Sequence, residues 1–425
     1  MNRTLSFSAK LLAGLLLLGC LAIAAIAWLN LRGEEPVSDI IPTAAPSAEL
    51  VQRGAYLARA GNCAACHTER GGAAYAGGKA LATPFGTVFA GNLTPDTETG
   101  LGRWSADHFW RALHHGRSRD GRLLYPAFPY TEYTQVTRED ADALYAFLRT
   151  VSAVHQANRP HELRFPYSTQ AALAVWRALN FQPGGFEPEK ARSAEWNRGA
   201  YLVRGLGHCA ACHAPRNFMG ATQNHLGLDG GLIPMQNWYA PSLASPAEAG
   251  LQDWSEADAI ALLQHGISPR GAAMGPMAEV VYASTQHLNA ADLQAMAVFL
   301  RELPRQAPAP QPQARANATV LGLGAKLYKA QCAACHGDNG EGSGSAYPAL
   351  AGHRGVTQAS SANLVKVIIH GGFPPTTDGN PHPYGMPPFG QSLDDTDIAA
   401  LASYVRSAWG NSGSGVTPFD VSRLR

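Results

Sequence analysis

The sequence predicts an all-α protein with three tandem small helical domains behind an N-terminal membrane anchor. Three observations lead to this prediction. The pentapeptide C-A-A-C-H occurs three times, similar helix-forming segments flank each copy, and a long apolar run stands near the N-terminus. Of the 425 residues, 46% are hydrophobic and 15% are charged, and the formal net charge is +1. That balance argues against nucleic acid as the main partner.

Six of the seven cysteines belong to the repeated pentapeptide. The three copies are Cys63, Cys66 and His67; Cys209, Cys212 and His213; and Cys332, Cys335 and His336. C-x-x-C-H is the attachment signature of a c-type haem, in which two thiols form thioethers with the porphyrin and the histidine ligates the iron. We therefore expect three small c-type cytochrome domains with three covalently bound haem c groups. No cysteine pair then remains for a disulfide, so each haem must supply much of its domain's core.

Residues 11–29 form an uncharged apolar run. At about 1.5 Å of rise per residue the run spans roughly 28 Å, close to the thickness of one hydrocarbon core. Arg3 and Lys10 precede it, whereas Glu34 and Glu35 follow it, and this bias places the N-terminus inside. Covalent haem attachment takes place outside the cytoplasm, so we expect the haem domains to face the periplasm from the bacterial inner membrane.

Two other processing routes compete with an uncleaved anchor. A-x-A spacing at Ala25 and Ala27 resembles a signal-peptidase site, so the segment would then be a cleaved signal peptide. The stretch that ends at Cys20 resembles a lipoprotein box, but the apolar run continues well past it. We favour the uncleaved anchor, in which Cys20 is an inert apolar residue.

Repetition and composition set the expected boundaries. The predicted segments are an N-terminal anchor or signal sequence (1–32), a linker (33–50), domain 1 (51–154), a connecting segment (155–194), domain 2 (195–303), a Pro-rich linker (304–316), domain 3 (317–410) and a mobile tail (411–425). The connecting segment contains an apolar stretch, residues 171–181, that we expect to pack between domains.

Each predicted domain begins with a helix that enters the C-A-A-C-H motif and ends with an amphipathic helix that has its own cap. The caps and their partners are Thr137 with Asp140, Asn289 with Asp292, and Asp394 with Asp397. An aromatic residue stands ten positions after each cap, at Phe147, Phe299 and Tyr404. The registers agree, so we expect the first and last helices of each domain to cross beside the porphyrin.

The sixth position of a cytochrome c iron is usually filled by methionine sulfur. Met386 stands eight residues before the last cap and is the expected ligand of the third haem. In domain 2, alignment on the W-S…G pattern shared with domain 1 brings Met277 opposite Phe128, so Met277 is the expected ligand there. Met274 is the alternative, whereas Met296 lies on the last helix and is expected in the core.

Domain 1 contains no methionine, so three readings of the first haem stay open. In the first, the iron is five-coordinate and Phe128 lies over its vacant face. In the second, a histidine substitutes, with His114 favoured and His108 as the other option. In the third, Tyr125, Tyr130 or a water molecule coordinates the iron.

His115 is a poor ligand candidate because His265 and His370 occupy the same position in domains that already have a methionine. A shared structural role explains these three histidines more simply. His114 also has an alternative reading as a surface residue beside four arginines between positions 111 and 122, which are most simply a solvated face.

Several long motifs carry a resemblance to a known family. They are G-A-Y-L-A-R-A-G-N-C-A-A-C-H, T-P-F-G-T-V-F-A-G-N-L-T-P-D-T-E-T-G-L-G-R-W, W-N-R-G-A-Y-L-V-R-G-L-G-H-C-A-A-C-H-A-P-R-N and G-P-M-A-E-V-V. With them the chain resembles the three-haem cytochrome c subunit of membrane-bound bacterial dehydrogenases that oxidise alcohols, gluconate or aldehydes. The resemblance covers nearly everything from residue 51 to about 408.

The resemblance implies an electron-transfer subunit that does not itself oxidise substrate. A catalytic partner with pyrroloquinoline quinone, flavin or a molybdenum cofactor does so, and the haems pass electrons to ubiquinone or a terminal oxidase. Alcohol-oxidising relatives read Y-P-A-M-P-Y where this chain has Phe128, which inclines us toward a molybdenum-type partner. Two other functions compete: peroxide reduction or gas sensing at an open first haem, aided by His108, His114 and Arg111, and a standalone carrier that serves an oxidase.

Overall fold

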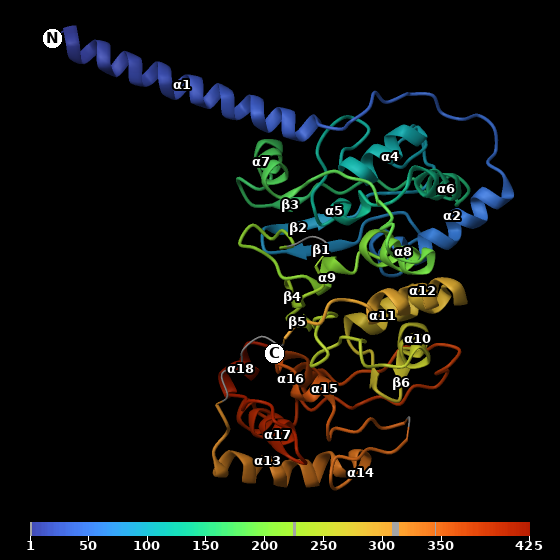
Figure 1. Ribbon diagram of the computed structural model, residues 1–425, viewed down its shortest axis with the longest axis vertical. Helices are drawn as coiled ribbons and strands as arrows, with labels where there is room; N and C mark the ends of the chain where they lie inside the picture. The colour runs from blue at the N-terminus through green and yellow to red at the C-terminus, as the bar shows by residue number, and fades with distance from the viewer. Residues whose placement is uncertain (1, 224–226, 308–313, 345) are drawn as a thin grey trace. The chain divides into compact units, whose positions relative to one another are not determined.

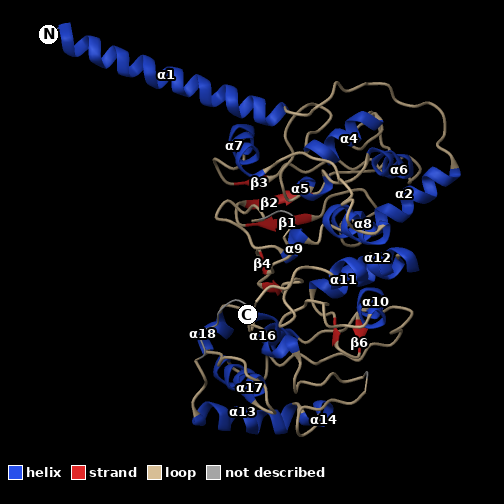
Figure 2. Cartoon of the chain, in the orientation of Figure 1, coloured by secondary structure: helices blue, strands red, loops and turns tan. Residues whose placement is uncertain are grey.

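The computed structural model describes residues 2–223, 227–307, 314–344 and 346–425 (Figure 1). Helices predominate, and the strands form one three-stranded and two two-stranded antiparallel sheets (Figure 2). The chain divides into two compact units. Unit 1 comprises Met1–Gly54 and His67–Phe186, and unit 2 comprises Ala55–Cys66 and Glu187–Arg425.

The elements of the chain up to Phe186 are seven helices and three short strands among the described residues. They are α1 (Asn2–Leu31), α2 (Ala48–Ala60), α3 (Cys63–His67), β1 (Ala80–Thr83), β2 (Gly86–Phe89), α4 (Ala106–His115), α5 (Tyr130–Tyr133), α6 (Arg138–Leu148), β3 (Glu162–Leu163) and α7 (Gln170–Asn180). β2 is the central strand, paired with β1 over its whole length and with β3 at Gly86 and Thr87.

The rest of the chain carries the second and third copies of the repeat. Its elements are α8 (Ala194–Tyr201), a π-helical turn (Leu202–Leu206), α9 (Ala210–His213), β4 (Gly231–Ile233), β5 (Trp238–Ala240), α10 (Glu256–His265), β6 (Ile267–Ser268), β7 (Gly271–Ala272), α11 (Pro276–Ala283), a 3₁₀ turn (Thr285–His287), α12 (Ala290–Arg301), α13 (Ala318–Gln331), α14 (Ala333–His336), α15 (Arg354–Thr357), α16 (Ala362–His370), α17 (Asp395–Ser407) and α18 (Pro418–Ser422).

A glycine on the first helix of each repeat lets that helix cross the last helix closely. A side chain at any of these glycines would collide with a backbone carbonyl and with the Cβ of an aromatic residue. The glycines and their neighbours are Gly54 with Ala143 and Phe147, Gly199 with Ala295 and Phe299, and Gly324 with Ala400 and Tyr404. The expected crossing of first and last helices is therefore confirmed, with the three aromatic residues at the crossing points.

The predicted caps of the last helices are also confirmed. Each cap side chain accepts a hydrogen bond from the predicted backbone N–H three residues on, which satisfies an otherwise unpaired donor. The pairs are Thr137 with Asp140, Asn289 with Asp292, and Asp394 with Asp397.

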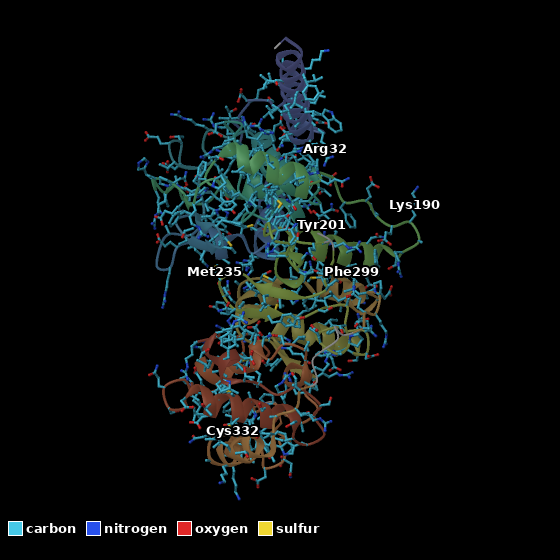
Figure 3. The ribbon with its side chains drawn as sticks, turned by 90° about the vertical axis from the view of Figure 1, so that its left-hand side faces the viewer. Arg32, Lys190, Tyr201, Met235, Phe299 and Cys332 are labelled. Atoms are coloured by element: carbon cyan, nitrogen blue, oxygen red, sulfur yellow. The ribbon has the colours of Figure 1, made fainter. Side chains whose placement is uncertain are left out.

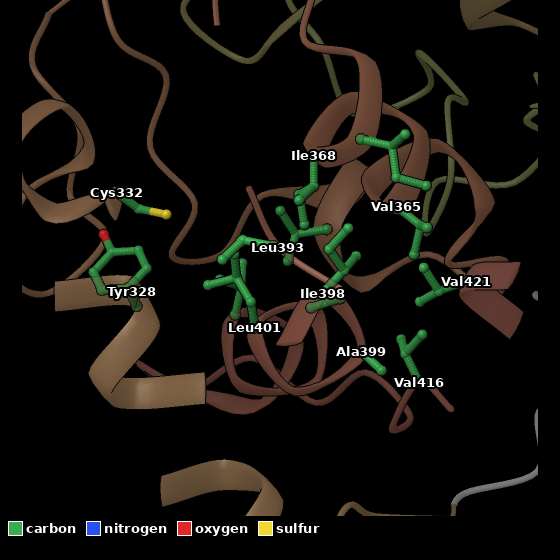
Figure 4. Packing of buried hydrophobic residues seen from close by; sticks show 14 residues of the cluster. Tyr328, Cys332, Val365, Ile368, Leu393, Ile398, Ala399, Leu401, Val416 and Val421 are labelled. Atoms are coloured by element: carbon green, nitrogen blue, oxygen red, sulfur yellow. The ribbon is translucent and has the colours of Figure 1, made fainter. Parts of the chain in front are cut away.

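One buried apolar cluster unites α13, α16 and α17 in the third repeat (Figure 4). Ile398 and Leu401 of α17 lie at its centre, and Val365 and Ile368 of α16 pack against them. Cys332, the first cysteine of the third motif, belongs to the same cluster. The first cysteine of the third motif therefore lies at the edge of this repeat's buried core.

The tail, expected to be mobile at residues 411–425, is packed instead. Val416 and Val421 belong to the buried apolar cluster of the third repeat. Thr417 and Asp420 form a capping box at the start of α18. The Nε of Arg425 donates a hydrogen bond to Asp395 at 2.5 Å. The segment is rich in glycine and serine, but it also contains these two valines, which pack in the same cluster as the buried side chains of α17.

Three other features differ from the sequence expectation. The small hairpins were not part of the all-α prediction. The two units do not follow the predicted domains, since predicted domains 2 and 3 both fall within unit 2.

Within unit 2, hydrogen bonds join predicted domain 3 to predicted domain 2. The Asn363 side chain bonds both the N–H and the C=O of Tyr239, at 2.9 and 2.7 Å, and Arg354 donates to the carbonyls of Pro246 and Gly250. The three-domain division remains a prediction, and residues 308–313 of its Pro-rich linker lie outside the described residues.

α7 is the third difference, because the apolar stretch of the connecting segment does not pack between domains. It lies beside the last turns of α1 within unit 1 (Figure 1). The amide of Asn30 donates to the Ala174 carbonyl at 2.9 Å and accepts from Nε of Arg177 at 2.9 Å. The long N-terminal helix is therefore joined to unit 1 at its end.

Candidate haem-binding sites

Each C-A-A-C-H motif folds into a short helical turn directly after the first helix of its repeat. α3, α9 and α14 carry these turns, and Figure 3 labels Cys332 at the start of the third. In every copy the first cysteine is buried or half-buried and the second is exposed. All seven cysteines lie in the described part of the chain, and none of them forms a disulfide. The two thiols of one motif therefore face different surroundings.

The histidine of every motif is oriented by the same kind of contact. Nδ1 of His67 lies 2.7 Å from the carbonyl oxygen of Gly91, Nδ1 of His213 lies 2.7 Å from that of Pro241, and Nδ1 of His336 lies 2.9 Å from that of Pro348. A carbonyl oxygen only accepts, so each Nδ1 must carry the hydrogen. Nε2 then presents its lone pair, which is the arrangement of an imidazole that ligates a metal.

Burial fixes the charge states in the first two motifs. It lowers the pKa of His67 and of His213, so both imidazoles are neutral at pH 7 and available as ligands. Burial also raises the pKa of Cys63 and Cys209 to about 12, and that of Cys332 to about 11. Neutral imidazoles, together with a first thiol that stays uncharged in each motif, fit a haem better than they fit a solvated metal ion.

The loop that carries Met386 is held by the residues after α16. Gly372 and Met386 exchange two backbone hydrogen bonds, at 2.8 and 3.0 Å. Gly371 has φ +63°, and a side chain there would collide with the Met386 carbonyl. The Met386 side chain packs against the buried cluster that contains Cys332. The structure therefore brings the predicted sixth ligand and the third motif to one cluster.

The two methionines considered for the second haem occupy different places. Met277 is the second residue of α11 and is half-buried. Met274 lies three residues earlier, and its Cε is 3.4 Å from the point where a Cβ on Gly372 would stand. Met274 is therefore directed toward the third repeat's loop, which favours Met277 as the ligand candidate. Met296 is buried on α12, as expected for a core residue.

Phe128 lies in a half-buried turn just before α5. Its ring centroid is 5.4 Å from that of Tyr133 and 6.4 Å from that of Tyr130. Tyr130 is fully buried, and burial raises its pKa to about 12, so the hydroxyl stays protonated. Tyr125 packs edge-on against the His161 ring. An aromatic cluster thus surrounds Phe128, the residue that the sequence alignment matches to Met277.

The two candidate histidines of α4 have other contacts. Nδ1 of His108 bonds Ser105 in the capping box of α4, and Nε2 lies 3.3 Å from an Asp39 carboxylate oxygen. Both ring nitrogens of His108 are thus engaged, which removes it as a free ligand. His114 stacks on Trp110, with centroids 4.4 Å apart, on the side of α4 away from buried Phe109 and Leu113.

Charge and local bonding further limit the distal chemistry proposed for the first haem. Burial, with a smaller contribution from His115, lowers the pKa of His114 to about 4, so its ring is neutral at pH 7. Arg111 donates to the carbonyls of Ser118 and Arg119 and thereby holds the loop after α4. His108 and His114 are the two histidines considered for the distal side of the first haem. Among the described residues, Nδ1 of His114 is buried without a hydrogen-bond partner, whereas neither ring nitrogen of His108 is.

Several known proteins are similar to this chain over most of its length. The cytochrome c family model matches residues 51–152 and 322–409. The cytochrome c subunit of the quinone alcohol dehydrogenase of Gluconacetobacter polyoxogenes is 39% identical over 394 residues, which cover 88% of this chain and 84% of that protein. The gluconate 2-dehydrogenase cytochrome c subunit of Pantoea cypripedii is 38% identical over 395 residues, with 88% and 89% covered.

The chain belongs to the family of dehydrogenase cytochrome c subunits. Membership implies covalently bound haem c, which fits the donor sets described above. The fructose dehydrogenase cytochrome subunit of Gluconobacter japonicus is also similar, at 36% identity over 405 residues, which cover 88% of this chain and 82% of that protein. The predicted resemblance is thereby confirmed at the level of the family.

Sequence reasoning did not identify the carbonyls that orient the motif histidines in this dehydrogenase cytochrome c subunit. Gly91, Pro241 and Pro348 lie 24, 28 and 12 residues after their histidines, so spacing could not reveal them. A weak signal was present, because each carbonyl residue is followed two positions later by leucine, in G-N-L, P-S-L and P-A-L.

Proposed function

We propose that this chain is a three-haem electron relay that accepts electrons from the catalytic subunit of a membrane-associated dehydrogenase. The electrons then pass to ubiquinone or to a terminal oxidase. The observation that carries the proposal is the same histidine geometry at all three C-A-A-C-H turns, with Nδ1 bonded to a carbonyl and the lone pair of Nε2 left to ligate iron. The named activities of the relatives supply the alcohol or sugar-acid class of complex.

Each motif has a defined division of labour in this proposal. The cysteine pairs would form the thioethers, the motif histidines would each ligate an iron, and Met277 and Met386 would supply a second ligand to the second and third irons. Bound haem iron supplies one-electron exchange between its ferric and ferrous states. The chain's own residues place the haems, exclude water and tune each potential through the ligand that they present.

The proposed location is the bacterial inner membrane, with the haem domains on the periplasmic side. Among the described helices, one is long and apolar enough to cross a membrane, over Phe7–Leu31. Support for its retention comes from its last turn, where Asn30 is bonded to Ala174 and Arg177. The helix also continues without a break through Ala27, where the competing cleavage site would lie.

For the first haem we propose a five-coordinate iron with Phe128 over its open side. Support comes from the absence of methionine in residues 51–154 and from the aromatic cluster around Phe128. An open iron is also the basis of the second candidate function, peroxide reduction or gas-ligand sensing. His114 is the remaining histidine for a six-coordinate alternative, and its stacking on Trp110 would have to break first.

The test of the relay is reconstitution in membranes with a co-purified catalytic subunit. Substrate for that subunit should reduce the haems, and added ubiquinone should reoxidise them. A standalone carrier would co-purify with no dehydrogenase subunit. The cofactor found in the partner, whether molybdenum, pyrroloquinoline quinone or flavin, would also decide the class of the complex.

A further inference from the structure

One face of α7 is apolar and exposed. Val175 and Leu179 lie four residues apart on it and are 41% and 69% exposed, and Ala171, one turn earlier, is exposed too. Leu173 and Arg177 on the other side of the helix are buried in unit 1. A contiguous apolar patch on a protein surface marks a place that meets a partner or a membrane, and these three side chains lie next to one another along one face of the helix.

α7 is held beside the outer end of α1. Two hydrogen bonds of the Asn30 side chain tie the helices together, one from its amide to the Ala174 carbonyl and one from Arg177 to its oxygen. A cavity of about 530 Å³ lies between the two helices. Its apolar lining includes Ile23, Ile26 and Ala27 from α1 and Ala171, Ala174 and Val175 from α7, and the loop residue Leu123 lines it as well.

The position of these contacts along α1 sets the depth of α7. Ile23 stands seven residues before Asn30, or roughly 10 Å along the helix axis at about 1.5 Å per residue. Ile23 and Ile26 lie within the uncharged apolar run 11–29, whose outer end must reach the boundary between acyl chains and headgroups when the run spans a bilayer. Side chains that line a cavity with Ile23 and Ile26 therefore lie at the same boundary.

The polar groups near this cavity are already bonded within the protein. Nε of Arg117 pairs with the Glu34 carboxylate at 2.7 Å, and its Nη1 donates to the Gly121 carbonyl. The Gln170 side chain exchanges hydrogen bonds with the backbone of Leu123 in both directions. The charge of Arg117 is thus balanced, so the cavity favours a hydrocarbon chain over an anionic headgroup.

We propose that α7 is a second membrane contact, lying in the outer boundary of the bilayer with Val175 and Leu179 inserted. A lipid hydrocarbon chain fills the space between α7 and α1. This inference rests on the proposed retention of α1 as a membrane anchor. It adds a fixed orientation to the proposed function, because a helix and a parallel surface element together restrict rotation of unit 1 above the membrane.

Photo-crosslinking of the full haem-loaded chain in phospholipid vesicles tests this inference. A benzophenone amino acid is placed singly at Leu179, at Leu18 within the apolar run, and at Phe218, which is 95% exposed in unit 2. We expect lipid adducts at Leu18 and Leu179 and none at Phe218, read by mass spectrometry of the peptides. Leu18 with lipid but Leu179 without it, or Leu179 joined only to another protein chain, would overturn the inference and leave the anchor standing. Absence of lipid at Leu18 would overturn the anchor and the inference together.

A second measurement uses the same probe at Val175. Leu179→Glu should lower the yield of lipid adduct at Val175 at least fivefold, because a charged side chain on this face resists insertion. Phe218→Glu is the matched control and should leave that yield unchanged. An equal yield in both variants would contradict the insertion of this face.

Discussion

The backbones of Gly372 and Met386 are bonded to each other in both directions, at 2.8 and 3.0 Å. The residues between Gly372 and Met386 form a loop that this pairing closes. Met386, at the end of the loop, packs against the buried cluster that contains Cys332. Gly371 allows the loop to close, because it adopts φ +63° and leaves room for the Met386 carbonyl. The position of the proposed sulfur ligand therefore depends on two consecutive glycines.

Gly371→Ala should displace Met386. The new methyl group would collide with the Met386 carbonyl, and a backbone at φ +63° and ψ −154°, a conformation essentially restricted to glycine, would cost about 1–3 kcal/mol in addition. We expect the third haem's potential to fall by about 59 mV or more, a tenfold change, with loss of the sulfur-to-iron charge-transfer band. Gly352→Ala is the matched control, since Gly352 has φ +69° but open space around it. Equal potentials in both variants would show that the collision has no effect on the ligand.

Met274→Ala should also act on the third haem. The Cε of Met274 lies 3.4 Å from the point where a Cβ on Gly372 would stand, so its removal leaves the loop pairing of Met386 less supported. We expect a shift of the third haem's potential by at least about 28 mV, a threefold change. Met235→Ala removes a 59% exposed methionine and is the control. If Met274→Ala instead removes the sulfur ligation of the second haem, Met274 and not Met277 is the ligand there.

Phe128→Met should convert the first haem into a six-coordinate, low-spin centre. The sulfur would occupy the open side of the iron, raise its potential and block carbon monoxide binding to the reduced protein. Magnetic and optical spectra before and after the change provide the measurement. Phe218→Met is the control, because that side chain is almost fully exposed. Three low-spin centres in the unaltered protein would contradict the five-coordinate proposal.

Gly324→Ala should destabilise the third repeat. A Cβ at Gly324 collides with the Ala400 carbonyl and the Tyr404 side chain, and overpacking of this kind costs about 1–3 kcal/mol. Gly322→Ala on the same helix meets open space and should stabilise α13 by up to about 1 kcal/mol. Thermal unfolding of both variants is the measurement. A similar change in melting temperature for both would argue against a close helix crossing.

Acid should weaken the contact around Asp292 in unit 2. Burial raises the pKa of this carboxyl, but hydrogen bonds from Arg198 and Tyr56 outweigh burial and hold it below 3.8. A depressed pKa contributes stability that is present above 3.8 and is lost as pH falls through the folded value. Asp292→Asn should lose stability at pH 7 and show a flatter dependence on pH below 4. Parallel acid-unfolding curves for Asp292→Asn and the unaltered protein would contradict this.

Local sequence signals located the motifs, the caps and the helix crossings. The sequence predicts the caps Thr137, Asn289 and Asp394 because a cap and its partner are three residues apart. The aromatic residues at the helix crossings are predicted because they stand at the same distance from each cap. Contacts between distant segments were not visible. The carbonyl of Pro241 reaches His213 across 28 residues, and Met274 meets Gly372 across almost a hundred. No spacing rule connects such residues, because tertiary packing brings them together.

Composition also misled in two segments. The tail is rich in glycine and serine, yet Val416 and Val421 complete the core over α17. The apolar stretch in α7 was expected to pack between domains, but its buried face meets unit 1 and its other face remains exposed. In both segments, the positions of two or three apolar side chains determine whether the segment is packed or exposed. Average composition does not contain those positions.

Intact-mass spectrometry of the mature chain tests the central claim most directly. The account predicts a mass excess of three haem groups, and loss of one group in each of three variants with both cysteines of one motif changed to alanine. Those pairs are Cys63 and Cys66, Cys209 and Cys212, and Cys332 and Cys335. An excess of fewer than three haems in the unaltered chain, or a variant that keeps all three, would contradict it.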